Sequence, residues 1–362
     1  MTSPSVSIGL PVRNGDEYLR TALDSLLAQD YRDFELNIWD NASDDGTSQI
    51  CLEYARADSR IRFHRSDTNV GAAENFNRVF RISRGKYFMW AAHDDCWHPS
   101  YVSRCLEGLE QNHDAVLCAS TVRFIDKCGV KLDDAALRDL TVRYNRLNTR
   151  SMSLVERVKE LSKTINWYAL YGLIRADILR QTKLVRDAYG GDVLLLMELL
   201  FHGETVILAD SLFEYRLIQK THERHAEDIT GKSSQPEKPK PYTQLAYDLL
   251  DLIGESAFSP SIKTILRDDF LENVSFANQL WASRIAIENQ PSVHAGDDRY
   301  LASIQIRDLL ARVPPRAPEE LRELRELAFE KYLSDLSAPR RLHHRIQRVL
   351  NRHLFWRFRP KA

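Results

Sequence analysis

The first half of the chain alternates short apolar runs with longer segments in which apolar residues recur every three or four positions. The short runs predict buried strands, and the longer pattern predicts helices with one face on the core. Strands that alternate with helices are typical of a mostly parallel sheet covered by helices. We expect strands at Val6–Val12, Phe34–Trp39, Ile61–His64, Tyr87–Ala92 and Ala115–Phe124.

Start signals mark several of the intervening helices. Asn14 and Thr47 are expected to cap the helices after the first two strands, because short polar side chains accept hydrogen bonds from free N–H groups at a helix N-terminus. Pro99 suits the first turn of a later helix. The predicted fold class is therefore α/β, with a Rossmann-like, mixed and mostly parallel sheet flanked by helices and followed by a helical C-terminal region.

The second half of the chain has a different organisation. From about Ser151 the pattern becomes more helical, and residues 231–241 are rich in proline, lysine and serine, which is typical of a linker or mobile loop. The domains that we expect are an α/β domain at 1–230, the linker at 231–241, a helical domain at 242–337 and a basic tail at 338–362.

Composition places the chain among ordinary globular proteins, with 43% hydrophobic and 28% charged residues. No apolar run approaches the roughly 20 residues that a membrane-spanning helix needs, and the N-terminus lacks the pattern of a signal peptide. The five cysteines have no CxxC spacing, so we interpret them as reduced thiols rather than a disulfide framework or a zinc site. We expect a cytoplasmic protein.

The near-neutral charge conceals a basic tail. Residues 340–361 contain seven arginines, one lysine and no acidic residue, which gives +8 against a net charge of −1 for the whole chain. Its apolar residues share one helical face, and Trp356 lies near its end. This pattern predicts a helix in the interface of an anionic membrane, on the inner face of the cell membrane. Packing on the helical region is the alternative, and nucleic acid is disfavoured because the rest of the chain is acidic.

Polar clusters follow three of the expected strands: Pro11–Asn14, Asp40–Asp45 and His93–Asp95. Each could be a solvated turn, but the carboxyl ends of parallel strands meet at one edge of a sheet, where ligands bind. Two adjacent carboxylates at such an edge repel each other, and a bound Mg²⁺ or Mn²⁺ that bridges to a diphosphate relieves the repulsion. The chain has neither a GxxxxGK[ST] phosphate loop nor a GxGxxG after the first strand, which disfavours P-loop kinases and Rossmann dehydrogenases.

Five ordered motifs resemble those of family 2 glycosyltransferases with the GT-A fold. They are PVRNGDEYL, IWDNASDDGT, NVG, HDD and GGDVLLLMEL, and the similarity extends from Ser5 to Arg216. The resemblance implies inverting transfer of a sugar from a nucleotide-diphosphate donor, assisted by Mn²⁺ or Mg²⁺. It implies nothing about the C-terminal third.

The resemblance also implies roles for individual residues. Asp192 matches the catalytic base, and Asp95 matches a direct metal ligand, with His222 as a second candidate ligand for the metal. The residues expected near the donor are Pro11 and Arg13 beside the nucleotide, Asp40 at the N–H of the base ring, Asn75, Asp94 near the sugar or ribose, and Arg216. Two departures, Glu74 where relatives often carry arginine and His93 where many carry a small residue or aspartate, concern donor contacts.

Several of these residues have a second interpretation. Asp192 is also suited to cap the apolar helix that follows it. Residues 220–225 fit either a lid over the diphosphate or a solvated stretch. The aromatic residues Trp167, Tyr168 and Tyr171 fit either a sugar-stacking wall near the acceptor or the core.

The leading hypothesis is transfer to a hydroxyl of a glycan or lipid-linked acceptor. A catalytically inactive nucleotide-sugar-binding or assembly protein and a sugar-phosphate nucleotidyltransferase are the alternatives. The nucleotidyltransferase is disfavoured because its glycine-rich, basic N-terminal signature is absent from the sequence. The sequence does not distinguish a UDP-, dTDP- or GDP-sugar donor.

Overall fold

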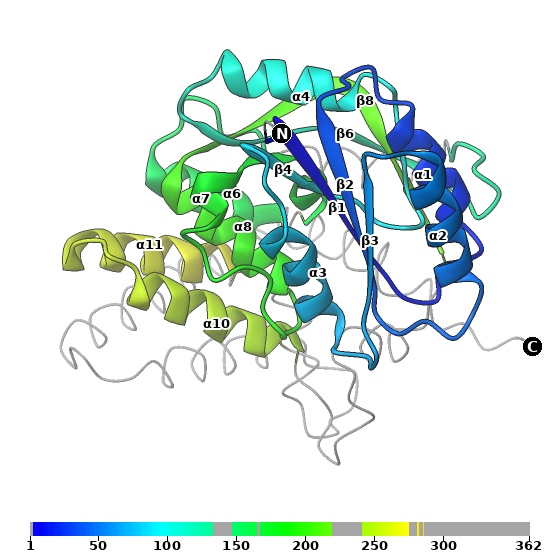
Figure 1. The fold of residues 1–362 in the computed structure, drawn as a ribbon. Helices are drawn as coiled ribbons and strands as arrows, with labels where there is room; N and C mark the ends of the chain where they lie inside the picture. Colours follow the sequence, from blue (N-terminus) through cyan, green and yellow to red (C-terminus); the bar gives the residue numbers. More distant parts are fainter. Residues whose placement is uncertain are drawn as a thin grey trace, which may run out of the picture. The chain divides into compact units, whose positions relative to one another are not determined.

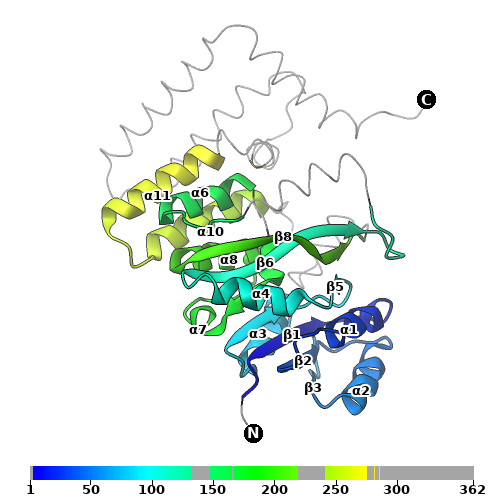
Figure 2. The same ribbon diagram turned by 90° about the horizontal axis from the view of Figure 1, so that it is seen from above.

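The computed structural model describes residues 3–132, 147–164, 167–218 and 241–274, together with Trp281 and Ile285. All of these lie within one compact unit, residues 1–289. The described part is built on a mixed sheet of eight strands with helices on both faces (Figures 1 and 2). The predicted α/β class with a mostly parallel sheet and C-terminal helices is confirmed.

The sheet has the order β3-β2-β1-β4-β7-β6-β8-β5. Strands β1, β2, β3 and β4 run parallel, as do β6 and β8, whereas β7 and β5 pair antiparallel to their neighbours. The strands are β1 Val6–Val12, β2 Phe34–Asp40, β3 Ile61–Arg65, β4 Tyr87–Trp90, β5 Cys96–Trp97, β6 Ala115–Ile125, β7 Leu173–Arg175 and β8 Glu204–Arg216.

Helices cover both faces of the sheet. On the β1–β3 side, α1 and α2 lie on one face and α3 on the other, as Figure 1 shows. The helices are α1 Leu19–Leu27, α2 Thr47–Ala57, α3 Ala72–Arg81, α4 Tyr101–Glu110, α6 Leu154–Thr164, α7 Ala176–Leu179, α8 Gly191–His202, α10 Pro241–Glu255 and α11 Pro260–Glu272, with a 3₁₀ turn, η1, at Tyr168–Tyr171.

The core follows from the apolar pattern of the central strands. Every residue of β1 is buried, as expected for a strand covered on both faces, and α1 contributes Leu19, Leu23 and Leu26 from one helical stripe. Burying a leucine or isoleucine side chain contributes about 1.5–3 kcal/mol each. This packing fixes the ends of β1, β2 and β4 at one edge of the sheet.

Two predicted helix caps are wrong. Helix α1 begins only at Leu19, with Tyr18 as its N-cap, and Asn14 instead has a left-handed backbone with φ of 50°. Thr47 is the first residue of α2 rather than its cap, and its hydroxyl accepts a hydrogen bond from the N–H of Gly15 at 2.8 Å. Both side chains accept hydrogen bonds from backbone N–H groups about 30 residues away in the sequence, instead of from the first turn of the helix that follows.

The more helical pattern expected after Ser151 holds only in part, because β7 and the long strand β8 lie there too. Strand β8 pairs along β6 with shifts of register, so its apolar positions do not alternate regularly. Helices α6, α8, α10 and α11 pack together on this side of the sheet (Figure 2). Residues 231–240 of the predicted linker and the whole basic tail lie outside the described residues. None of the described helices combines the length and apolarity that crossing a bilayer requires.

Candidate functional site

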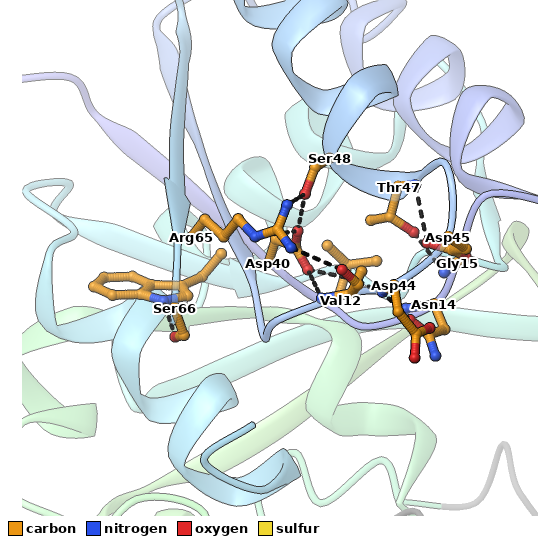
Figure 3. Close-up of polar contacts among 12 residues, drawn as sticks. Val12, Asn14, Gly15, Asp40, Asp44, Asp45, Thr47, Ser48, Arg65 and Ser66 are labelled. Atoms are coloured by element: carbon orange, nitrogen blue, oxygen red, sulfur yellow. Dashed lines mark hydrogen bonds and ion pairs between the residues drawn. The ribbon is translucent and has the colours of Figure 1, made fainter. Parts of the chain in front are cut away.

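The loops that follow β1 and β2 are joined by hydrogen bonds at the C-terminal edge of the sheet (Figure 3). The N–H of Asn14 donates to the hydroxyl of Ser43 at 2.9 Å, and the N–H of Asp44 donates back to the side-chain oxygen of Asn14 at 3.1 Å. Beyond them the N–H of Asp16 donates to Asp45. These reciprocal hydrogen bonds hold the two loops together at this edge of the sheet.

Asp40 organises the second of these loops from the end of β2. Its carboxylate is fully buried, and it accepts hydrogen bonds from the N–H of Ser43 at 2.9 Å and from the hydroxyls of Ser43 and Ser48. The guanidinium of Arg65 lies 3.8 Å from the same carboxylate and donates to Ser48 and to the carbonyl of Ser43 (Figure 3). Sequence reasoning missed these three partners, because two of them lie at a distance along the chain.

Asn75 reaches the same edge from α3. It is buried, and its Nδ2 donates to the carbonyls of Trp39 at 3.1 Å and Val12 at 3.4 Å, so it joins the ends of β2 and β1. Its Oδ1 is buried without a hydrogen-bond partner among the described residues. Glu74, the residue before Asn75, forms ion pairs with Arg78 and Arg81.

The paired carboxylates follow β4, and they differ in their surroundings. Asp94 is half-buried, whereas Asp95 is almost fully buried. Oδ1 of Asp95 accepts the N–H of Arg216 at 2.8 Å, and Oδ2 has no hydrogen-bond partner in the described part of the chain. Burial and the nearby charge of Asp94 raise the pKa of Asp95 well above its usual range, against the opposing effect of Arg216.

Arg216 ends β8 and is held by many partners. Its guanidinium donates to the carbonyl of Asp94 at 2.7 Å and to the carbonyls of Asp126 and Lys127, and it lies 4.6 Å from the centre of the Tyr18 ring. The side chain is buried. Arg216 therefore braces the loop that carries the paired carboxylates.

Asp192 lies in the first turn of α8 and is half-buried. Burial raises the pKa of its carboxyl, although the N–H groups of Val193 and of Asp192 itself oppose the effect. The N-cap of α8 is Gly190, with a left-handed φ of 74°, so the interpretation of Asp192 as the N-cap is wrong. Its oxygen accepts the N–H of Val193 at 2.8 Å.

Tyr171 ends η1, which contacts both β4 and α8. Burial is the largest cause that raises the pKa of its hydroxyl well above the usual range, and the charges of Asp95, Tyr215, Asp94 and Asp192 act in the same direction. The electrostatic effects of the paired carboxylates and of Asp192 therefore reach the same phenol group.

Comparison with known proteins identifies the family of the N-terminal part of this chain. The family described as Glycosyl transferase family 2 matches residues 7–161. An uncharacterized glycosyltransferase of Rickettsia typhi is 35% identical over 117 residues, 32% of this chain and 36% of that protein. A putative glycosyltransferase of Bacillus subtilis, EpsH, is 31% identical over 127 residues, 35% of this chain and 36% of that protein. The chain contains a glycosyltransferase family 2 domain.

The family 2 domain has the GT-A fold. The structure of S. aureus TarS residues 1–349 in complex with UDP-GlcNAc matches 86% of this chain and 82% of that chain, with a TM-score of 0.61 and 15% identity. At this identity the likeness shows the fold alone. The chain spans about a third of the length of the Rickettsia typhi and Bacillus subtilis relatives.

The remaining predicted residues of the family 2 domain lie at different depths. Pro11 is buried in β1, whereas Arg13 is exposed and forms no hydrogen bond or ion pair with the residues that the structure describes. The ring of His93 packs against Gly15, where an added Cβ would lie 2.4 Å from it. His222 and the candidate lid at 220–225 lie outside the described residues.

The aromatic residues proposed as a sugar-stacking wall pack on the core. Tyr168 is buried and contacts the ring of Phe124, and Tyr171 is half-buried with its ring 5.5 Å from that of Phe213. Within the described part of the chain, no group of three or more histidine, cysteine, aspartate or glutamate side chains forms a metal site from protein ligands alone.

Proposed function

We propose that this chain is an inverting glycosyltransferase that moves a sugar from a nucleotide-diphosphate donor to a hydroxyl of a glycan or lipid-linked acceptor. The observation that carries the proposal is the pair of carboxylates after β4, of which Asp95 is buried with one oxygen unpartnered among the described residues, in a chain that contains a family 2 domain; Asp192 follows in the first turn of α8. Asp94 and Asp95 suit the binding of a metal-bound diphosphate, and Asp192 suits the role of a base for the acceptor hydroxyl.

Asp192 is the general base of the proposed reaction. Its carboxylate takes the proton of the acceptor hydroxyl while the acceptor oxygen bonds to the anomeric carbon and the bond from that carbon to the diphosphate breaks. The nucleoside diphosphate leaves with the bonding electrons. Because burial raises the pKa of Asp192, it is a stronger base than an exposed aspartate.

The residues present fit a divalent cation at Asp95. Oδ2 of Asp95 is a buried carboxylate oxygen without a partner among the described residues, and such an oxygen is a ligand that Mg²⁺ and Mn²⁺ prefer. Asp94, half-buried beside it, is placed for a second contact. A bound Mg²⁺ or Mn²⁺ would stabilise the charge that develops on the departing diphosphate. Magnesium sites commonly use one or two carboxylates together with substrate phosphates.

We assign binding of the nucleotide-sugar donor to the hydrogen-bonded loops that follow β1 and β2. We assign exposed Arg13 to the phosphates or the nucleoside, and Asn75, whose Oδ1 has no partner among the described residues, to a hydrogen bond with the donor. Asp40 is the predicted partner of the base N–H. Arg216 acts on the donor by bracing Asp94 and Asp95. Because TarS is described with UDP-GlcNAc, a UDP-sugar is the first donor to test, followed by dTDP- and GDP-sugars.

The decisive experiment replaces Asp192. A thermal-shift panel of nucleoside diphosphates and their sugars, with and without Mn²⁺, first identifies the donor, since a ligand of the folded state raises apparent stability. We expect Asp192→Asn to bind this donor normally and to lose transfer by roughly 10²–10⁴-fold, the usual contribution of a general base.

The matched control is Asp177→Asn, because Asp177 is likewise a first-turn aspartate but is exposed on α7. It should transfer sugar like the wild type. Loss of donor affinity together with turnover in Asp192→Asn would assign Asp192 to donor binding or folding instead.

A further inference from the structure

The segment that delivers Asp192 to the site is an irregular loop between α7 and α8, residues 183–190. Within it Leu184 has a left-handed backbone, with φ of 60°. A residue other than glycine in this region costs on the order of 1–3 kcal/mol and persists only when the surrounding structure imposes it. The loop is therefore held in place from outside.

Two buried polar side chains hold the loop on either side of Leu184. On one side, Asn77 of α3 donates from Nδ2 to the carbonyl of Val185 at 2.8 Å, and the N–H of Val185 donates back to Oδ1 of Asn77 at 3.0 Å. On the other side, the N–H of Lys183 donates to Glu198 of α8 at 2.7 Å. Asn77 and Glu198 are each 7% exposed.

Glu198 also fixes the next part of the loop. Its second carboxylate oxygen pairs with the guanidinium of Arg186 at 2.5 Å. A carboxylate that binds both a backbone N–H and a guanidinium on one loop determines the loop's distance and its orientation. The paired hydrogen bonds of Asn77 likewise fix the register of Val185, which an apolar contact would leave free to slide.

Gly191 transmits this placement to Asp192. A Cβ at Gly191 would lie 2.2 Å from the carbonyl oxygen of Arg186, so the backbone before Asp192 rests directly on the loop. The N–H of Gly191 also donates to the carbonyl of Ala188 at 3.0 Å, and the N–H of Ala188 donates to that of Arg186 at 2.8 Å. A shift of Arg186 must therefore move the first turn of α8.

We propose that Asn77 and Glu198 are positioning residues that hold the 183–190 loop so that the carboxylate of Asp192 faces the acceptor hydroxyl. The proposal rests on the proposed function, in which Asp192 is the base. Within the described part of the chain, the side-chain hydrogen bonds of Asn77 and Glu198 involve neither the loops after β1 and β2 nor the paired carboxylates. Their loss should therefore affect the chemical step and leave donor binding intact.

The test compares two alanine variants of buried asparagines in the full-length protein. Asn77→Ala should lower kcat by about tenfold to a hundredfold, because a displacement of about 1 Å at a reacting group can cost a hundredfold. The donor Kd, measured by calorimetry with Mn²⁺, should stay at the wild-type value. Asn37→Ala is the control, since Asn37 is a buried asparagine of β2 that donates to Ser83 and does not contact the loop.

The control separates positioning from stability. Both variants lose a buried amide and should melt earlier than the wild type, but at a temperature where both are folded Asn37→Ala should keep its kcat. Equal values of kcat for Asn77→Ala and the wild type would overturn the proposal, as would an equal loss of kcat in Asn37→Ala.

Glu198 supplies a second, independent set of variants. Glu198→Gln keeps an oxygen for the N–H of Lys183 and loses the ion pair with Arg186, so its kcat should fall less than that of Glu198→Ala. A wild-type kcat in both Glu198 variants would contradict the role of Glu198.

Asp192→Asn is measured in parallel to separate the two proposals. If it retains full turnover, the proposed function fails. If it is inactive and Asn77→Ala is fully active, only the positioning role fails.

Discussion

The carboxyl group of Asp95 combines deep burial, a raised pKa and one oxygen without a partner among the described residues. We expect Asp95→Asn to keep its fold, because an amide oxygen still accepts the N–H of Arg216. It should lose Mn²⁺-dependent nucleotide binding and most transfer, because an amide is a poorer ligand for a hard cation. Calorimetric titration of the nucleotide with and without Mn²⁺ measures this.

Asp210→Asn is the matched control, since Asp210 is an exposed carboxylate that pairs with Arg104. It should bind like the wild type. Undiminished Mn²⁺-dependent turnover of Asp95→Asn would remove Asp95 from the metal site.

At this scale the sequence suggests candidate residues but not their contacts. Adjacent carboxylates after a strand indicate Asp94 and Asp95, whose roles stay predictions. Arg65 and Asn77 carried no such signal, because their roles depend on partners 17 to 108 residues away. Arg216 was assigned to the donor, and the structure surrounds it with carbonyl groups of this chain.

Near their N-terminal ends, strands β1 and β2 are joined through the buried carboxylate of Glu35. Glu35 accepts hydrogen bonds from the hydroxyl of Ser7 at 2.7 Å and from the guanidinium of Arg84 at 2.7 Å. Burial alone would raise the pKa of Glu35, but the hydrogen bonds from Arg84 and Ser7 outweigh it and lower the pKa. Such a group stabilises the fold above its unfolded pKa, near 4.3, and the contribution is lost as pH falls through the lower, folded pKa.

We therefore expect Glu35→Gln to reduce the free energy of unfolding at neutral pH by about 1–3 kcal/mol, the usual cost of a lost charged hydrogen bond in a buried site. The difference from the wild type should shrink as pH falls below the folded pKa of Glu35. Urea denaturation at a series of pH values measures it. Glu53→Gln, which breaks an exposed pair with Arg20, should change stability little, and a difference for Glu35→Gln that did not depend on pH would contradict the assignment.

The elements themselves were predictable where periodicity was strong. The five expected strands are all present: four are apolar runs long enough to be recognised, and the third, β3, alternates apolar and polar residues. Strand β7 has only three residues and β5 only two, so neither contains a full pattern, and their existence depends on pairing with β4, β6 and β8. Strand β8 was missed because its register shifts against β6 break the alternation.

At the scale of the whole chain, the basic tail remains a prediction from sequence. We expect the full-length protein to sediment with anionic liposomes and not with neutral ones, since each basic residue near such a surface contributes about 1 kcal/mol. A chain that ends at Pro339 should stay in the supernatant. Equal partitioning of the two proteins onto anionic liposomes would show that residues 340–361 are not the anchor.

The contacts of Arg216 have a consequence for folding during translation. Asp95 and the Tyr18 loop emerge from the ribosome long before residue 216, whose backbone N–H and guanidinium hold them. At about 5–20 residues per second, the N-terminal strands wait roughly ten to forty seconds for that partner. During translation, therefore, the nascent chain cannot complete the packing around Asp95 until β8 has emerged. The loop after β4 reaches its final arrangement only after residue 216 has been made, although its own residues were synthesised far earlier.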